Sequence, residues 1–264
     1  DVLGSRGLGD VYKRQMFGAV AKSYFAQKLG VDPHDIFVVS IMPCTAKKSE
    51  AALPTMRDAC GDADVDVVLT TREIVRMFRG EQINPAVLDE TPFDSPLGSG
   101  TGAAVIFGAT GGVMEAALRT VADVLEGKDL ESIEYTAVRG LEGIKEATVQ
   151  VAGMDIKVAI AHGTANAGRL LNSIRKGERT YHFIEIMGCP GGCVTGGGQP
   201  IVNARTRYQI DPREARAKAT YECDRAMPIR KSHQNPSIHK LYGEFLEKPG
   251  SHKAHALLHT TYVE

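Results

Sequence analysis

The sequence predicts an α/β fold with two lobes, in which mixed sheets are flanked by helices and a helical segment ends the chain. Short apolar runs of strand length, such as 36–42 and 181–187, alternate with longer segments of helical periodicity, such as 17–29 and 165–176. This alternation is typical of βαβ units with parallel strands. Beyond residue 199 the chain is polar and helical without strands, which predicts the C-terminal helical tail.

The first hundred residues predict helices and strands that lead to a long polar loop. The run 36–42 is almost continuously apolar, which is typical of a strand buried on both faces. Thr71 is a residue type that caps helices, and Glu73 follows in the first turn. In chain order we predict a helix at 17–29, a turn at 32–35, a buried strand at 36–42, a strand at 64–70, a helix at 72–79 capped by Thr71, and a loop at 85–102.

The rest of the chain predicts a second set of strands and then helices alone. A hairpin is indicated by two alternating segments around Gly153-Met154-Asp155. We place a domain boundary near residue 205, where the polar helices begin. In chain order we predict a short strand at 105–107, a helix at 111–125, strands at 146–151 and 156–162, a helix at 165–176, a strand at 181–187, and helices at 212–225 and 236–246.

Composition limits the function classes. At 264 residues the chain can form one large domain or two modest ones. A net charge of −1 implies no nucleic-acid partner and no anionic membrane surface. No apolar run reaches the roughly 18–20 residues of a membrane span. Five cysteines in a chain of this size are not a disulfide framework, and they fit the reducing cytoplasm, although a periplasmic location stays open.

Three cysteines lie where a predicted strand ends and a loop begins. Cys44 follows the run 36–42, and Cys189 follows the run 181–187, with Cys193 four residues later. Open α/β sheets bind their ligands at such strand ends. Thiolates suit zinc and iron–sulfur clusters, and the glycines around Cys193 let the backbone approach a bulky inorganic group.

Other interpretations of the cysteines compete with a cluster. An isolated cysteine often packs as a small hydrophobic residue, and we interpret Cys60 and Cys223 as ordinary thiols of a loop and a polar helix. Zinc sites usually carry C-x-x-C pairs, whereas Cys189 and Cys193 are spaced by three residues. A non-catalytic zinc- or iron–sulfur-binding module therefore remains the alternative function, and metal analysis with visible absorbance would separate the two metals.

Two longer motifs contain these cysteines. Residues 42–50 read MPCTAKKSE, and residues 185–200 read EIMGCPGGCVTGGGQP. They resemble the second and third H-cluster signatures of the iron-only hydrogenases. The similarity runs from about residue 16 to the C-terminus and includes 102–117, whereas the segments 230–236 and 257–262 resemble the small subunit of that family, here fused to the catalytic part.

The resemblance implies a fold built around a buried cluster site, and an oxidoreductase that interconverts dihydrogen with protons and electrons. It implies that Cys44, Cys189 and Cys193 bind a 4Fe–4S cluster and that Cys193 bridges this cluster to a diiron subsite. An ammonium group can donate hydrogen bonds to a bound anion, and the family's pattern gives Lys47 such a contact with a diiron cyanide ligand. By motif position, the side chains that line the diiron pocket are Met42, Phe107 and Met187.

The resemblance also implies partners. They are dihydrogen and protons, with an electron carrier that is either ferredoxin or an NAD(P)-linked partner subunit. The sequence does not choose between the carriers.

One part of the family pattern is missing from the given residues. The first signature, T-S-C-C-P-x-W, does not occur, and the chain contains no Trp. Residues 1–15 do not resemble the family and are interpreted as a non-native leader, which leaves 16–204 as a partial catalytic domain and 205–264 as the small-subunit-like segment. We expect this truncated fragment to be inactive alone, because the fourth cluster ligand and the proton relay would lie upstream.

Overall fold

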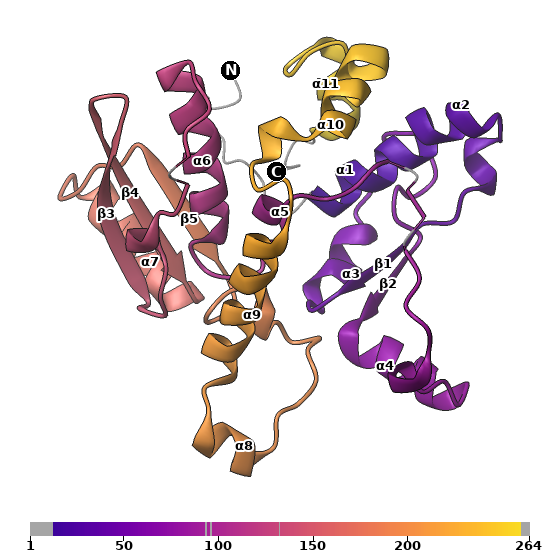
Figure 1. The fold of residues 1–264 in the computed structure, drawn as a ribbon, viewed down its shortest axis with the longest axis horizontal. Coiled ribbons are helices and arrows are strands. Elements are labelled where there is room, and N and C mark those ends of the chain that lie inside the picture. Colours follow the sequence, from indigo (N-terminus) through magenta and orange to yellow (C-terminus); the bar gives the residue numbers. More distant parts are fainter. Residues whose placement is uncertain (1–12, 93, 96, 132, 260–264) are drawn as a thin grey trace. The chain divides into compact units, whose positions relative to one another are not determined.

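The structure is a computed structural model that describes residues 13–92, 94–95, 97–131 and 133–259. Most of the predicted leader and the end of the 257–262 motif lie outside these residues. The chain divides into two compact units, which are treated separately below (Figure 1). Unit 1 comprises the described residues within Asp1–Ser99, Gly197–Pro200 and Pro236–Glu264, and unit 2 comprises those within Gly100–Gly196 and Ile201–Asn235.

Unit 1 contains a two-stranded parallel sheet. Strand β1 (Val39–Met42) pairs with β2 (Val67–Thr70), so that Met42 lies opposite Thr70. Helix α4 (Thr71–Gly80) follows β2 directly, and the Thr70 hydroxyl accepts a hydrogen bond from the Glu73 amide while the Glu73 carboxylate accepts one from the Thr70 amide. This capping box satisfies amides that the first turn leaves unpaired. The cap is therefore Thr70, one residue before the predicted Thr71.

Strand β1 is more exposed than its apolar sequence predicts. Val39 and Ile41 are 47% and 55% exposed, and Phe37 just before them is 67% exposed, whereas Ser40 on the other face is buried. The prediction of a strand buried on both faces is wrong here. The reason is that this sheet has two strands in the described part of the chain, and nothing described there covers the face of these three side chains.

The N-terminal helix of unit 1 packs against the end of the chain. Segments α1 (Lys13–Val20), η2 (Ala21–Phe25, a π-helical turn) and α2 (Ala26–Leu29) run on as one helix, which confirms the predicted helix at 17–29. Their apolar face, including Tyr24, meets Phe245 and Ala254 in one core cluster. The partners in the tail are α10 (Pro236–Leu241), η8 (Tyr242–Leu246) and α11 (His252–Leu258).

Unit 2 is a three-layer arrangement of one sheet between two helices (Figure 1). Its strand order is β3-β4-β5, antiparallel between β3 (Ile144–Val151) and β4 (Met154–His162) and parallel between β4 and β5 (Phe183–Met187). Alternate residues of β4 point to opposite faces: one set packs with α6 (Gly112–Glu126) and the other with α7 (Thr164–Arg175). The predicted hairpin is confirmed, but its turn is Ala152-Gly153, one residue earlier than expected.

One predicted strand of unit 2 is a helix. Residues 105–107 were predicted as a strand, but helix α5 spans Gly102–Ile106, with the Thr101 hydroxyl accepting from the Ala104 amide at 3.4 Å. Ala103 and Ile106, three positions apart, are both fully buried in a cluster with Ala116 of α6. A three-residue apolar run cannot distinguish a buried strand from a short helix, and the cap and the three-residue spacing decide here.

The remaining elements are short, apart from one helix. The α/β class with mixed sheets and flanking helices is confirmed, and so are the helices of the tail. No helix within the described ranges has the length and apolar character that a membrane crossing requires. In chain order these elements are η3 (Pro33–Asp35), α3 (Ala46–Ala51), η4 (Pro85–Val87), η5 (Thr136–Val138), η6 (Cys193–Thr195), α8 (Ala204–Gln209), the long α9 (Pro212–Ala226) and η7 (Ser232–Gln234).

Candidate functional site

Cys44 lies in unit 1 between the end of β1 and the start of α3. Met42 is the last residue of β1, and both Met42 and Cys44 are half-buried. Lys47 lies on α3, where its ammonium donates to the Glu50 carboxylate at 2.6 Å. The two side chains are only 17% and 5% exposed, so the charge of Lys47 is held in a largely buried pair next to the Cys44 loop.

The end of the second cysteine motif also belongs to unit 1. The Gly198 amide donates to the carbonyl of Pro43 at 2.9 Å, and the Gly198 carbonyl accepts from the Arg72 amide at 3.0 Å. A Cβ atom at position 198 would lie 2.9 Å from the Pro43 carbonyl carbon and 3.0 Å from the Cys44 nitrogen. Only glycine allows this approach without displacement. The two motifs therefore meet through their backbones directly beside Cys44.

Cys189 and Cys193 lie in unit 2, on a turn that follows β5. Both are half-buried, and the Gly192 amide donates to the Cys189 carbonyl at 3.0 Å. The Val194 amide donates to the Gly108 carbonyl at 2.9 Å. At Gly192 φ is +97°, and a Cβ atom there would lie 2.7 Å from the Gly108 oxygen. The cysteine turn is thus hydrogen-bonded to the segment that follows α5.

Phe107 and Met187 belong to the same part of unit 2. Phe107 is half-buried, directly follows the last residue of α5, and packs on the cluster of Ala103, Ile106 and Ala116. Its neighbour Gly108 is the residue bonded to the cysteine turn. Met187 is 4% exposed and ends β5. The structure therefore gathers Phe107, Met187, Cys189 and Cys193 within unit 2, and it gathers Met42, Cys44 and Lys47 within unit 1.

Glu185 is a buried residue of the site region to which the sequence analysis gave no role. Its carboxylate accepts from the amides of Gly111 and Met114 at 2.6 and 2.8 Å, at the start of α6. A carboxylate at a helix N-terminus satisfies unpaired amides and interacts favourably with the helix dipole. Glu185 and Met187 share the buried face of β5, and the exposed Ile186 lies between them. A charged residue at an inward position of an apolar strand was the signal that could have revealed it.

Lys145 lies beside Gly111, whose amide contacts Glu185. Its ammonium donates to the carbonyls of Val138 and Gly140 at 2.8 and 2.9 Å. Burial lowers the pKa of Lys145 to about 8, against the opposing effect of the nearby Glu185 charge. Two buried groups of opposite charge therefore flank the segment that supports the cysteine turn.

Helix α9 supports the cysteine turn from the other side. The Arg216 guanidinium donates to the Val194 carbonyl at 3.0 Å. Further along α9, Asp224 forms a bidentate pair with Arg119 of α6, with both contacts at 2.8 Å. Arg119 also donates to Glu115 of α6 at 2.8 Å. All three side chains are fully buried. Burial opposes the charge of Arg119, but these two carboxylates raise its pKa overall.

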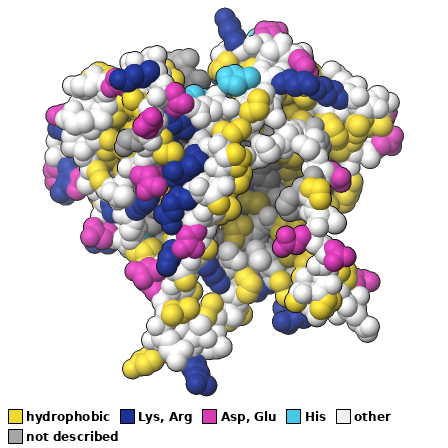
Figure 2. Space-filling view, in the orientation of Figure 1, with side chains coloured by type: hydrophobic (Ala, Val, Ile, Leu, Met, Phe, Trp, Pro, Cys, Tyr) yellow, Lys and Arg dark blue, Asp and Glu magenta, His cyan; other side chains and the backbone are white. Residues whose placement is uncertain are grey.

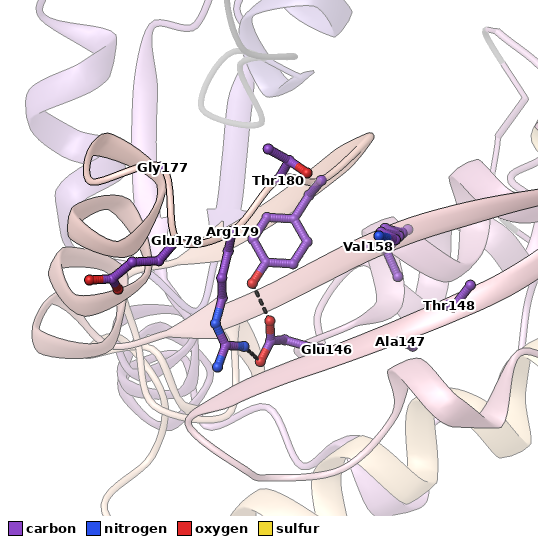
Figure 3. A pocket seen from close by; sticks show the side chains of 10 residues that line it. Glu146, Ala147, Thr148, Val158, Gly177, Glu178, Arg179 and Thr180 are labelled. Carbon is purple, nitrogen blue, oxygen red and sulfur yellow. Dashed lines mark hydrogen bonds and ion pairs between the residues drawn. The ribbon is translucent and has the colours of Figure 1, made fainter.

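A pocket of unit 2 lies apart from these residues. Figure 3 shows residues that line it, from β3, β4 and the segment 177–181. Its volume is about 420 Å³. At its wall the Glu146 carboxylate accepts hydrogen bonds from both Arg179 and Tyr181, so its charge is already compensated. None of the seven candidate residues lines this pocket, and we assign it no role in the chemistry of the cysteines.

Comparison with known proteins matches both parts of the chain. Residues 13–197 match the family described as iron only hydrogenase large subunit, C-terminal domain, and residues 210–264 match iron hydrogenase small subunit. The NADP-reducing hydrogenase subunit HndD of Solidesulfovibrio fructosivorans is 46% identical over 251 residues, which are 95% of this chain and 42% of that protein. The chain therefore spans less than half the length of this relative.

A solved structure and a more distant relative extend the comparison. A variant of the FeFe-hydrogenase HydA1 from Chlamydomonas reinhardtii superposes with a TM-score of 0.79 at 39% identity, covering 95% of this chain and 68% of that one. The cytosolic Fe-S cluster assembly factor narfl of Xenopus tropicalis is 31% identical over 254 residues, 94% of this chain and 52% of that protein.

Proposed function

This chain belongs to the iron-only hydrogenase family, and from that premise we propose that it contributes to an H-cluster. In this proposal Cys44, Cys189 and Cys193 bind a 4Fe–4S cluster, and Cys193 also bridges it to a diiron subsite. The whole protein would interconvert dihydrogen with protons and electrons.

One observation carries the proposal more than any other. Gly198 contacts the backbone of Pro43 and Cys44 within unit 1, and Gly198 follows Cys193 by only five residues. The chain thus passes directly from the third candidate thiol to the loop of the first. A pair of unrelated structural cysteines would need no such connection.

The donor set and its surroundings fit the proposed group. Thiolates are the ligands that iron–sulfur clusters use. The backbone near Gly192 and Gly198 is packed so closely that added Cβ atoms would clash, and the thiols next to both glycines are only partly exposed. Glycine at both positions lets the segments that carry the thiols pack closely on neighbouring backbone, which fixes where the thiols lie.

The protein's own residues would bind and orient the group. When bound, the diiron subsite would supply the cleavage and formation of dihydrogen, and the 4Fe–4S cluster would supply electron transfer. Lys47 would donate hydrogen bonds to an anionic ligand of the subsite, since its ammonium is kept in a largely buried position by Glu50. The apolar side chains of Met42, Phe107 and Met187 would exclude water, which tunes the redox potential of such centres.

Further parts of the proposal concern partners and organisation. The name of the NADP-reducing relative supports an NAD(P)-linked carrier, with ferredoxin as the alternative. We retain residues 16–204 as the catalytic part and 205–264 as the small-subunit-like part, located in the cytoplasm. Because the given residues hold three candidate cluster thiolates and lack the first signature, we expect them to retain little diiron subsite by themselves.

Anaerobic reconstitution with iron and sulfide tests the ligand assignment. We expect brown absorbance and bound iron in the unmodified chain, and a loss of iron in Cys44→Ser, Cys189→Ser and Cys193→Ser alike. Cys223→Ser, at an exposed position of α9, is the control and should keep its iron. Equal iron in all four variants would refute the assignment, and tight binding of zinc in place of iron would support the alternative zinc module.

A longer version that carries the first signature tests the activity. With maturation proteins supplied, it should evolve hydrogen from reduced methyl viologen, and Lys47→Asn should lose the diiron subsite while it keeps the 4Fe–4S cluster. Unchanged hydrogen evolution in Lys47→Asn would count against the role of this lysine.

The assembly-factor relative supports a second candidate function. Its 31% identity extends over 94% of this chain, so a protein named as an Fe-S cluster assembly factor shares much of the same sequence. A longer version that binds 4Fe–4S but evolves no hydrogen after full maturation would favour that candidate. The higher identity to the hydrogenase subunit favours the first.

A further inference from the structure

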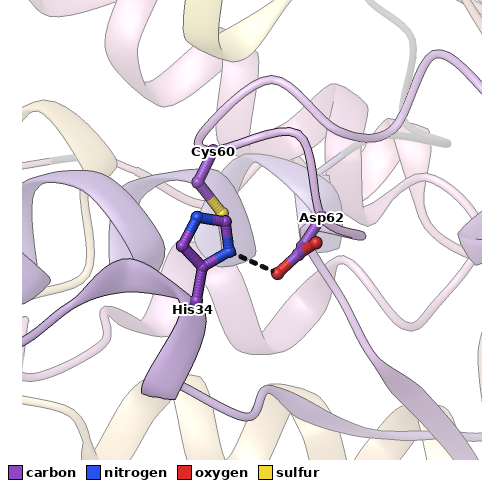
Figure 4. Close-up of side chains that lie close together, drawn as sticks. All are labelled: His34, Cys60 and Asp62. Atoms are coloured by element: carbon purple, nitrogen blue, oxygen red, sulfur yellow. Dashed lines mark hydrogen bonds and ion pairs between the residues drawn. The ribbon is translucent and has the colours of Figure 1, made fainter.

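Three side chains of different chemistry meet on the surface of unit 1, away from the candidate cluster residues in the sequence. They are His34 of η3 and, from one loop, Cys60 and Asp62. Their nitrogen, sulfur and oxygen atoms all lie within 4.8 Å of one another. Figure 4 shows the thiol and the carboxylate directed toward the imidazole ring, and the His34 Nδ1 lies 2.7 Å from the Asp62 Oδ2.

We propose that His34, Cys60 and Asp62 bind a divalent transition-metal ion, best suited to zinc. Imidazole, thiolate and carboxylate are the ligands that zinc combines in proteins, and hard cations such as Mg²⁺ do not prefer a thiolate. Among the described residues the set supplies three ligands, which leaves the fourth tetrahedral position to water. This inference is independent of the proposed hydrogenase function.

The geometry requires only small side-chain movements. Tetrahedral zinc with bonds of about 2.0–2.3 Å places its ligand atoms roughly 3.4–3.7 Å apart. The present separations, from 2.7 Å to at most 4.8 Å, bracket that range. The side chains of His34 and Asp62 are 57% and 52% exposed, so they can rotate without disturbing a packed core.

The backbone on both sides of the set is already held in place. The Asp32 carboxylate accepts from the His34 amide at 2.9 Å and fixes the start of η3. In the loop, Gly61 adopts φ +88°, a left-handed conformation that favours glycine, and its carbonyl accepts from Arg57 at 3.3 Å. Ligand side chains on fixed backbone lose less entropy on binding a metal than those on a free loop.

The local charge also favours a cation. Besides Asp62, the carboxylates of Asp32 and Asp35 act electrostatically on His34. The sequence alone did not reveal this set, because His34 is 26 positions before Cys60, and the spacing matches no metal-binding motif.

A bound metal would link two segments that lead into the sheet of unit 1. His34 precedes β1 by five residues, and Asp62 precedes β2 by five residues. The two strands are already paired with each other. The metal would add a further link between the segments before them, at the end of the strands opposite to Cys44. Stabilisation of the unit that carries Cys44 is the consequence we expect, because a ligand bound only to the folded state stabilises it.

Cobalt titration of the metal-free chain under anaerobic conditions tests the proposal, with zinc displacement to measure affinity. The candidate cluster thiols can also bind these metals, so the comparison is between variants. We expect the unmodified chain and Cys223→Ser to bind one more equivalent than Cys60→Ser, with the loss of one set of thiolate-to-cobalt absorbance. His34→Gln and Asp62→Asn should bind this equivalent at least about 10-fold more weakly.

Two results separate a true site from other outcomes. Circular dichroism and the metal-free melting midpoint of Cys60→Ser should match those of the unmodified chain, since serine is close to cysteine in size and Cys60 is only half-buried. Equal cobalt stoichiometry and equal zinc affinity in Cys60→Ser and Cys223→Ser would overturn the proposal. Iron reconstitution at Cys44, Cys189 and Cys193 should be unaffected by Cys60→Ser, so failure of this inference and failure of the proposed function are distinguishable.

Discussion

The two loops that carry the candidate cluster thiols are held by different kinds of interaction. In unit 2 the turn of Cys189 and Cys193 rests on buried charges and backbone hydrogen bonds, with Glu185 at the start of α6 and the Arg119–Asp224 pair behind it. In unit 1 the Cys44 loop extends from a two-stranded sheet with an exposed apolar face. It is held by the hydrogen bond from Gly198 to Pro43, with β1 before it and α3 after it.

This difference predicts that the Cys189–Cys193 turn is more rigid than the Cys44 loop. A buried ionic network is costly to disturb, because a charge that loses its partner stays buried. A loop on an exposed sheet can adjust at lower cost. We therefore expect substitutions behind the Cys189–Cys193 turn to affect stability strongly, and substitutions around Cys44 to act locally.

The largest expected effect comes from breaking the ionic network of unit 2. Asp224→Ala removes the bidentate partner of Arg119 and one partner of Arg230. The free energy of unfolding should fall by about 3–5 kcal/mol, measured by urea denaturation. Glu222→Ala on the same helix breaks only an exposed pair with Lys218 and is the matched control. Similar losses in both variants would show that the buried network does not hold the turn.

A pair of glycine substitutions compares the two loops directly. Gly192→Ala places a Cβ 2.7 Å from the Gly108 oxygen at a positive φ, and it should cost about 2–3 kcal/mol. Gly198→Ala meets Pro43 at 2.9 Å without a positive φ, so it should cost less and act mainly on iron retention. Denaturation and iron content measure the two effects.

Each glycine has a neighbour that serves as its control. Gly188→Ala would meet nothing within 4 Å, and Gly197→Ala would come no closer than 3.3 Å to the Thr45 hydroxyl oxygen. Both should behave nearly like the unmodified chain. If Gly188→Ala is as damaging as Gly192→Ala, the turn is sensitive to any side chain and not to the contact with Gly108.

A pH series tests unit 2 separately from unit 1, because the buried Lys145 belongs to unit 2. Burial lowers its pKa to about 8, whereas an unfolded lysine titrates near 10.4. Below about pH 8 the lysine is charged in both states and the burial penalty is complete. Between about pH 8 and 10 the unfolded state binds more protons, so stability should rise with pH by about 1–3 kcal/mol. Lys145→Met should flatten this rise in denaturation curves, and an unchanged slope would contradict it.

The smallest effect is expected at the helix cap beside the Cys44 loop. Thr70→Ala removes the side-chain half of the capping box of α4, which should cost about 1 kcal/mol. Thr70→Ser keeps the hydroxyl and is the control. The Glu73 amide donates a hydrogen bond to the Thr70 hydroxyl. Hydrogen exchange at this amide should therefore accelerate in the alanine variant alone.

The sequence predicted local features of the structure better than it predicted contacts between distant residues. The positions of Cys44 and Cys189 at strand ends follow from apolar runs that stop at a proline or glycine, and the structure has β1 and β5 there. The exposed face of β1 was not predictable, because the number of strands beside it is a property of the whole sheet. The contact of Gly198 with Pro43 joins residues 155 positions apart.

Charged residues were the other gap. Glu185 lies in an apolar strand, and its partners at Gly111 and Met114 are 74 and 71 positions away. Periodicity indicates which face it shares with Met187 but not which amides it meets. The same applies to Cys60, whose neighbour His34 comes from another segment.

The discontinuous composition of unit 1 has a consequence for the order of folding. Its core joins Tyr24 to the tail, and the Tyr24 hydroxyl donates to Glu244, 220 positions later, at 2.6 Å. The core of unit 2 closes between Met114 and Ile160, over a much shorter stretch of chain. Contacts distant in sequence form slowly, because the connecting chain must be ordered first. During synthesis unit 2 can therefore fold while α1, η2 and α2 still lack their partners in residues 236–258, so unit 1 begins earlier in the chain than unit 2 but is completed later.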